Sequence, residues 1–356
     1  MSIQRLQRHT LVSRSGGCGA ALALVFAAGL AWADDVVLIA GSTVKQAIGG
    51  RVRGAVESES PSGVVVSLGA SSVSVPIDQI ASIRYDGQTA TLQLAETRLA
   101  AGQLAEAAGY FKQAAGESTD KPFVLQKALY GEAAALADLA LIEPTRQKEA
   151  RDKLSRFVQS YPGSRHIIPA REALIRIQIA SGDFPGAETT LTGLAKLPQA
   201  KDRAAVLRAK VLAKQGRHDE AISELDRLLA ALPDRSTAQR EAKLIKAESL
   251  VGVKKFKEAE TLLEQVIQAA PPEDVATQSA AYNALGDCLR AANRPKDALL
   301  AYLHTDLLYS KDRQEHPRAL FQIEKLFRSL KQDGRADEYA QRLRQEYPHS
   351  QWTSAK

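Results

Sequence analysis

The chain has 356 residues and carries 47 Lys and Arg against 41 Asp and Glu, a formal net charge of +6 at pH 7. Three of the arginines precede residue 15, and without them 44 basic side chains face 41 acidic ones. A charge so close to neutral argues against nucleic acid as a partner. The two cysteines are Cys18 and Cys288, and they are too few for a disulfide framework.

The first 33 residues have the three parts of a signal peptide. Three arginines form a basic front without acidic residues, and an apolar run over residues 20–31 follows. This run is shorter than the roughly 20 apolar residues of a transmembrane helix. Ala-Trp-Ala at 31–33 fits the small-x-small cleavage rule. We predict an exported protein, periplasmic or secreted, that is cleaved after Ala33; the alternative is a retained N-terminal anchor.

Cleavage would also remove Cys18, which lies before the apolar run and lacks the Leu that a lipoprotein signal carries three residues earlier. Cys288 is then the sole cysteine, and we interpret it as a small buried apolar residue rather than a reactive thiol. A second apolar run of about 20 residues is missing from the sequence. We therefore expect no transmembrane segment in the mature form. The oligomeric state stays open.

Residues 34–88 are predicted to form a small β-barrel domain. Short runs rich in Val, Ile and Ser alternate with Gly, Ser and Pro clusters, which is typical of about five strands. Their number and spacing are similar to SH3-like or Sm-like folds, without a diagnostic motif. Asp86-Gly87-Gln88 is a turn signal that ends the domain before the first helical pattern.

Residues 280–309 have the pattern of two short helices joined by a turn. Apolar or small side chains recur at helical spacing in the first half, and Asn-Arg-Pro at 293–295 forms the turn. Gly286 and Ala298 are small where two helix backbones are expected to approach closely. The order aromatic, Leu-Gly, Leu, turn, Ala, aromatic resembles the tetratricopeptide repeat (TPR).

The same unit recurs along the chain. A key position follows each turn by about one helical turn, at spacings of 34 to 43 residues: Ala107, Ala150, Ala187, Ala221, Ala259, Ala298 and Tyr339. In the seventh unit the predicted turn residue is Gly334. We predict a mainly α fold in which residues 89–352 form a right-handed TPR-like superhelix of about seven helical hairpins. Tyr339 marks an atypical last unit, as terminal caps of such arrays are.

Two hairpins end in a Tyr-Pro-x-Ser turn, at 161–164 and 347–350. This ending resembles TPR proteins of the bacterial envelope, in which the repeats are a docking surface for other envelope proteins. The resemblance implies a non-catalytic adaptor or scaffold that binds other envelope proteins or extended peptide segments.

Motifs for chemistry are missing from the sequence. It has no H-E-x-x-H helix, no phosphate-binding G-x-x-x-x-G-K-[ST] loop and no G-x-S-x-G elbow. We therefore predict no catalytic residues, no cofactor site and no metal site. Two alternatives stay open: a cell-wall or glycan-acting enzyme with an unrecognised site, and ligand binding by the β-domain with the repeats as a spacer. Convergent buried carboxylates, or a His with an orienting partner in one pocket, would favour the enzyme.

The TPR resemblance also implies a concave groove lined by positions 2, 5, 9 and 12 of each unit, counted with the key residue as position 20. The predicted groove residues are Arg203, Lys210, Glu248, Asn283, Asp287, Arg290 and Arg328. At position 9, the fourth to seventh units carry Lys210, Glu248, Asp287 and Arg328. Such alternating charges are consistent either with ion pairs between repeats or with a mixed-charge binding groove. Asn283, Asp287 and Arg290 are expected to be surface residues.

Overall fold

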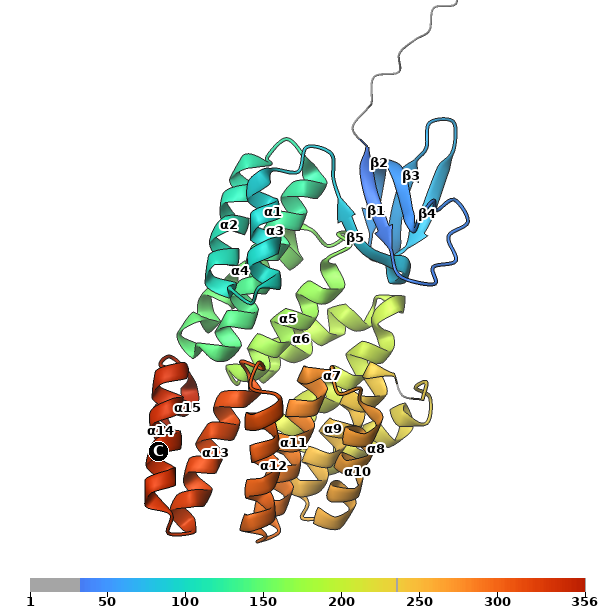
Figure 1. The fold of residues 1–356 in the computed structure, drawn as a ribbon. Helices are drawn as coiled ribbons and strands as arrows, with labels where there is room; N and C mark the ends of the chain where they lie inside the picture. The colour runs from blue at the N-terminus through green and yellow to red at the C-terminus, as the bar shows by residue number, and fades with distance from the viewer. Residues whose placement is uncertain (1–32, 235, 356) are drawn as a thin grey trace, which may run out of the picture. The chain divides into compact units, whose positions relative to one another are not determined.

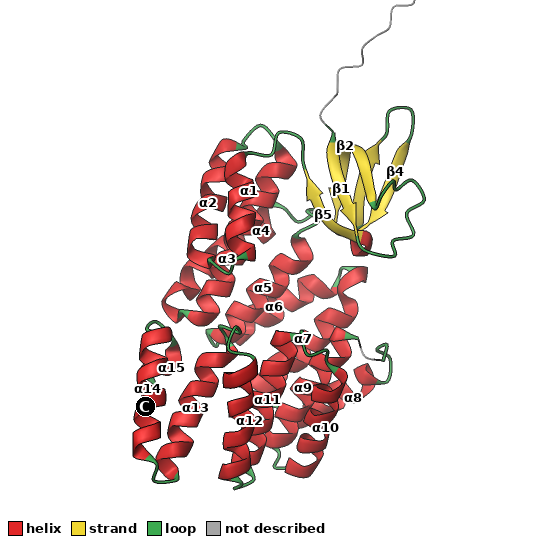
Figure 2. Ribbon diagram, viewed as in Figure 1, coloured by secondary structure: helices red, strands yellow, loops and turns green. Residues whose placement is uncertain are grey.

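The computed structural model describes residues 33–234 and 236–355, which form one compact unit (Figure 1). The predicted signal peptide, apart from Ala33, lies outside the described residues. Strands occupy the N-terminal part of the described chain and helices the remainder (Figure 2). No helix among the described residues combines the length and the apolar character that crossing a bilayer requires.

The N-terminal part is an antiparallel sheet in the order β4-β3-β2-β1-β5. Its strands are β1 (Asp34–Leu38), β2 (Arg51–Ser60), β3 (Gly63–Ser67), β4 (Ser72–Pro76) and β5 (Ile80–Arg84). Valines alternate with serines along β4, and Val52 and Val56 are the two buried residues of β2, so one face is buried and the other faces solvent.

The sheet is open, and the expected closed barrel is not confirmed. Strand β4 pairs with β3 and strand β5 pairs with β1, which leaves β4 and β5 as the two edges. The short 3-10 helix η1 (Ile77–Gln79) carries the chain from one edge to the other. The amide of Ile39, just after β1, bonds the carbonyl of Gln79 at 3.0 Å. This bond directs β5 toward β1 instead of β4.

Seven consecutive helix pairs follow within the described residues, as the repeat pattern predicts. The helices are α1 (Ala90–Ala100), α2 (Leu104–Glu117), α3 (Pro122–Ile142), α4 (Gln147–Ser160), α5 (Ile167–Ala180), α6 (Phe184–Ala195), α7 (Lys201–Lys214), α8 (His218–Leu229), α9 (Thr237–Gly252), α10 (Phe256–Ala269), α11 (Val275–Ala291), α12 (Pro295–Leu308), α13 (Glu315–Ser329), α14 (Asp333–Glu346) and α15 (Gln351–Ser354). The last, α15, is a single short turn after the seventh pair.

The predicted small positions lie at the contacts between helices. All six key alanines from Ala107 to Ala298 are fully buried. Gly286 is also needed where it stands, because a Cβ on it would lie 2.6 Å from Cε1 of Tyr302. The close approach predicted for Gly286 and Ala298 is therefore confirmed.

The seventh hairpin corrects the predicted register. Its left-handed turn residue is Lys331, with a φ of 58°, whereas Gly334 lies inside α14. Five residues after Lys331 comes Ala336, which is fully buried, whereas Tyr339 is half-buried. The same five-residue step joins Gly216 to Ala221 and other turns to their key alanines. The seventh key residue is therefore Ala336, and the groove positions of this hairpin move back by three residues.

Buried polar contacts join the sheet to the first hairpins. The ammonium group of Lys127, on α3, donates to the carbonyl oxygen of Ile83 at 2.8 Å. Arg165 lies 3.3 Å from the carboxylate of Glu59, whose side chain is almost fully buried, and donates to the hydroxyl of Tyr85 at 3.2 Å. Burial raises the pKa of Glu59, and the charge of Arg165 partly opposes this effect.

The array curves back on itself. Arg313, in the loop between α12 and α13, donates to the carbonyl oxygen of Gly102, in the turn of the first hairpin, at 3.3 Å. In Figure 1 the last helices (red) accordingly come close to the first hairpins (green). This curvature brings first helices of separate hairpins around one cavity.

Candidate functional site

A partly open cavity of about 440 Å³ lies among the helices of the curved array. Its charged lining comes from four first helices: Arg176 on α5, Lys210 and Lys214 on α7, Glu248 on α9, and Glu315 and Arg318 on α13. Leu141, Ile179 and Trp352 add apolar walls. A smaller cavity of about 200 Å³ shares Lys214, Glu248 and Arg318 and extends to Asp287 on α11. We call these two cavities together the groove.

The repeat register explains why these side chains meet. Arg176, Lys210, Glu248 and Asp287 each lie eleven residues before a key alanine, at position 9 of four successive hairpins. Stacking the hairpins places the same helix face of each unit along one wall. The structure thus places Lys210, Glu248 and Asp287 in the groove, as predicted from the sequence.

Glu248 is surrounded by cations. Its carboxylate lies 3.0 Å from the ammonium group of Lys214. Burial alone would raise the pKa of Glu248, but Lys214, Arg318 and Lys210 together bring that pKa below its usual value. Glu248 is therefore ionised at neutral pH, and its ion pair with Lys214 links the fifth hairpin to the fourth.

The larger cavity has an excess of positive charge. Among its described lining residues, four cations face the two carboxylates of Glu248 and Glu315. Lys214 and Arg318 pair with these or neighbouring carboxylates, and Arg176 lies 3.5 Å from Asp138. The ammonium group of Lys210 has no ion pair or hydrogen bond to any described residue. It is the cation in the groove that is most available to a partner.

Asp287 is held by its own neighbours. The hydroxyl of Tyr302 donates to it at 2.6 Å, Arg318 of the next hairpin donates to its second oxygen, and Arg290 lies 3.7 Å away. One edge of Asp287 faces the smaller cavity. The side chain therefore links two hairpins and contributes to the groove.

Arg203 lies between repeats rather than in the groove. Its guanidinium lies 3.1 Å from Glu172 of the preceding hairpin and donates to Glu241 of the following one. These contacts are ion pairs between repeats, one of the two alternatives that the charged groove positions allowed in the sequence. Half-buried pairs of this kind join three hairpins through one side chain.

Asn283 is not a surface residue, and that prediction is wrong. The side chain is fully buried, and its amide donates to the backbone carbonyl of Glu315 at 2.9 Å and to the Glu315 carboxylate at 2.8 Å. Position 5 of α11 faces the start of α13, so packing of the next hairpin covers it. Asn283 therefore fixes the spacing of hairpins and is inaccessible to a partner.

Arg290 is exposed, as expected, and Arg328 is exposed as well, but neither lines the larger cavity. Arg328 pairs within its own hairpin, at 3.1 Å from both Glu324 and Asp337. It borders a separate shallow hollow with Glu324. In the corrected register Arg328 is at position 12, and Arg318 takes position 2.

Sequence reasoning missed Arg176, Lys214 and Arg318. Arg176 occupies position 9 of the third hairpin and could have been found by counting back from Ala187. Lys214 lies one helical turn after Lys210 on the same helix face. Arg318 was hidden by the register of the seventh hairpin, because Lys331 carries no sequence signal for a left-handed turn.

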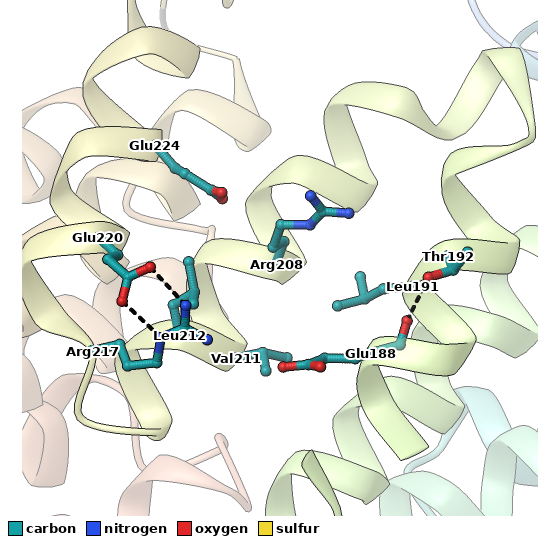
Figure 3. A pocket seen from close by; sticks show the side chains of 9 residues that line it. All are labelled: Glu188, Leu191, Thr192, Arg208, Val211, Leu212, Arg217, Glu220 and Glu224. Carbon is teal, nitrogen blue, oxygen red and sulfur yellow. Dashed lines mark hydrogen bonds and ion pairs between the residues drawn. The ribbon is translucent and has the colours of Figure 1, made fainter. Parts of the chain in front are cut away.

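A separate cavity of about 300 Å³ opens between α6 and α8 over α7 (Figure 3). Glu188, Glu220 and Glu224 surround it, and Arg217 donates to both carboxylate oxygens of Glu220 at 2.8 and 2.6 Å. Arg208 projects into this space (Figure 3). Two residues turn an α-helix by about 200°, so Arg208 and Lys210 lie on opposite sides of α7.

A His–carboxylate pair exists, but it does not face a cavity. His316 Nε2 lies 2.9 Å from Asp306, and the two side chains are 1% and 3% exposed. Neither side chain lines a cavity described above. Among the residues that the structure describes, no group of three His, Cys, Asp or Glu side chains is placed to hold a metal ion.

The comparisons with known proteins agree with this architecture. A family model described as the tetratricopeptide repeat matches residues 173–236 and 246–304. The chain carries tetratricopeptide repeats. Proteins with these repeats generally act as scaffolds for protein–protein interaction. A search of the curated proteins found no match.

Two solved structures are similar to this fold at low sequence identity. A tetratricopeptide repeat protein from Parabacteroides merdae is 13% identical, with a TM-score of 0.51, over 72% of this chain and 91% of that one. A Rap protein complexed with Competence and Sporulation Factor is 14% identical, with a TM-score of 0.51, over 74% and 76%. At these identities the likeness shows the fold alone.

Proposed function

We propose that this protein is an exported, non-catalytic adaptor that binds an extended segment of another cell-envelope protein in its groove. The observation that carries the proposal is the cavity whose walls come from first helices of separate TPR hairpins. Such a surface presents many side chains at once without rearrangement, which suits an extended chain.

The chemistry of the groove indicates how a segment would be held. Lys210 makes no ion pair or hydrogen bond to the residues that the structure describes, so its ammonium group can bind a carboxylate of the partner, whereas Leu141, Ile179 and Trp352 can cover apolar side chains. The ion pairs of Glu248 with Lys214 and of Asp287 with Arg318 fix the walls between the hairpins. A wall fixed in advance reduces the entropy cost of binding.

Two further features support the adaptor role. The first 33 residues have the pattern of a cleaved signal peptide, and the Tyr-Pro-x-Ser endings are similar to those of envelope TPR proteins. The Rap protein of similar fold was solved in complex with a factor, so a fold of this kind can hold a partner.

Affinity capture tests the binding role. Mature protein, residues 34–356, is used to capture proteins from a native envelope extract, alongside Lys210→Glu and a matched control, Arg208→Glu. Both variants make the same charge change on α7, but only Lys210 lies in the groove. We expect the affinity of Lys210→Glu for the captured partner to fall at least tenfold, equivalent to about 1.4 kcal/mol. Arg208→Glu should capture as much partner as the wild type.

Equal capture by the wild type and both variants would show that the binding surface lies outside the groove. Equal melting temperatures are required for the comparison, because a folding defect would also reduce capture. N-terminal sequencing of the protein from the envelope fraction tests export: the sequence should begin at Asp34, and a cytoplasmic protein that begins at Met1 would contradict it.

A further inference from the structure

The solvent face of the sheet carries an excess of arginines. Asp35 on β1 lies between Arg53 on β2 and Arg84 on β5, because it is the register partner of both. Arg51, two residues before Arg53, lies 2.6 Å from the Asp35 carboxylate, and Arg53 lies 3.7 Å from it. Arg84 is exposed and makes no ion pair or hydrogen bond to a described residue. Three arginines therefore share one carboxylate.

Other charges near this face leave the excess in place. Lys45, in the loop between β1 and β2, is exposed and adds a positive charge. Asp78, on η1, is exposed and adds a negative one. Helix η1 lies beside the end of β1, because the amide of Ile39 bonds the carbonyl of Gln79. Four cations of this region thus face two carboxylates.

An apolar tip lies at one end of the arginine face. Gly49 and Gly50, with φ of 59° and 73°, form the two-residue turn that joins Ile48 to Arg51. Partners across a hairpin lie on the same face of a sheet, so Ile48 is on the same side as Arg51. The side chain of Ile48 is 86% exposed, the highest value of the exposed large apolar residues in the described chain.

A second isoleucine lies on this face. Val36 and Leu38 of β1 are buried, so the alternation of the strand turns Val37 and Ile39 toward solvent. Ile39 is 41% exposed. Single exposed apolar residues are ordinary on a protein surface, but these adjoin one another and a cluster of arginines.

The shape and charge of the tip point to its partner. An added Cβ at Gly49 or Gly50 would meet nothing within 4 Å, so the turn protrudes into open space. A folded protein would need a hollow that matches this tip, whereas the headgroup layer of a bilayer yields to it. Anionic lipid phosphates complement the arginines, and the acyl region can receive an isoleucine.

We propose that the solvent face of the sheet binds the surface of an anionic phospholipid bilayer, with Ile48 inserted below the headgroups. Arg53 and Arg84 contact the phosphates, because a guanidinium matches their geometry. Stable attachment of a peripheral protein takes two signals, and this face combines an apolar contact with a basic cluster. The proposal is independent of what the groove binds, and it would hold the groove at a membrane surface.

Co-sedimentation of mature protein, residues 34–356, with lipid vesicles tests this proposal. We expect binding to vesicles of equal parts phosphatidylcholine and phosphatidylglycerol, little binding to phosphatidylcholine alone, and a loss of binding between about 50 and 500 mM salt. Arg84→Glu, and independently Ile48→Ser, should weaken the binding at least tenfold. Both side chains are exposed, and unchanged melting temperatures confirm that the variants fold.

Matched controls change residues outside the sheet. Arg208→Glu makes the same charge change on α7, and Leu307→Ser removes an exposed leucine from α12; neither should affect vesicle binding. Lys210→Glu, which disables the proposed groove, should also bind vesicles as the wild type does. Lipid binding and partner capture can therefore fail separately.

A fluorescence measurement tests the insertion. Ile48→Cys, labelled with an environment-sensitive fluorophore, should brighten on anionic vesicles, whereas labelled Leu307→Cys should not. Wild-type protein that binds both kinds of vesicle equally, or neither, overturns the proposal, as does binding that neither Arg84→Glu nor Ile48→Ser weakens. Capture of an acidic protein that depends on Arg84, without binding to vesicles, would also overturn it and would assign this face to a protein partner.

Discussion

Gly286 of α11 lies directly against the ring of Tyr302 on α12. A Cβ added at Gly286 would come within 2.6 Å of both Cε1 and Cζ of that ring. Tyr302 cannot move aside easily, because it is fully buried and its hydroxyl donates to Asp287 at 2.6 Å. One small residue thus sets the separation of the two helices.

We therefore expect Gly286→Ala to lower the free energy of unfolding by about 1 to 3 kcal/mol, the usual cost of overpacking. The matched control is Gly109→Ala on α2, where an added Cβ meets nothing within 4 Å. That control should instead gain up to about 1 kcal/mol from helix propensity. Urea unfolding of both variants measures the difference, and equal effects would show that the α11–α12 contact is looser than described.

Asn283→Ala should destabilise the protein. It removes both hydrogen bonds to Glu315, one to its backbone carbonyl and one to its side-chain carboxyl group, in a fully buried site. The expected loss is about 2 to 4 kcal/mol. Arg290→Ala, on the same helix but exposed, should change stability by no more than about 0.5 kcal/mol. Similar unfolding midpoints for the two variants would contradict the burial of Asn283.

Asp306 should make the last hairpin sensitive to acid. Burial acts to raise the pKa of Asp306, but hydrogen bonds from His316 and Arg342 outweigh it and bring this pKa well below the usual value. The unfolded chain therefore binds a proton to Asp306 more readily than the folded chain does. Its contribution to stability is present above about pH 4, the ordinary pKa of Asp, and is lost as the pH falls below that value.

Asp306→Asn should consequently lower the free energy of unfolding by about 1.5 to 3 kcal/mol at pH 7. The difference from wild type should shrink as the pH is reduced from about 5 to 2. Chemical unfolding across this pH range measures it. A difference that stays constant with pH would mean that the ionised carboxylate of Asp306 does not stabilise the fold.

Cys288 should be unreactive in the folded protein. Its side chain is buried, its thiol lies 3.3 Å from the carbonyl oxygen of Phe256, and burial, assisted by the charge of Glu260, raises its pKa to about 11. At pH 8 almost no thiolate is present, and thiolate is the reactive form. Ellman's reagent should label the thiol only after denaturation. Complete labelling of native protein within minutes would refute this placement.

Local physics made the repeats predictable. Three short-range signals located the hairpins from Gly102 to Asn293. They are a left-handed turn residue, a small residue five positions later, and an apolar residue one helical turn beyond that. The groove residues Lys210, Glu248 and Asp287 followed from the same count, because stacking gives equivalent positions equivalent neighbours. The register failed in the seventh hairpin because Gly334 offers a glycine turn signal three residues after Lys331, the residue that adopts a φ of 58°.

Tertiary packing decided the remainder. The burial of Asn283 depends on where Glu315, 32 residues away, lies against it, and no periodicity in α11 encodes that. The open sheet depends on β5 pairing with β1, the most distant strand in sequence, rather than with β4, which immediately precedes it in the chain. The groove itself needs the array to curve until Arg313 reaches Gly102. Neighbouring residues determine the helix period and the turns, so the sequence shows them. The groove forms only because small rotations between successive hairpins add up along the array.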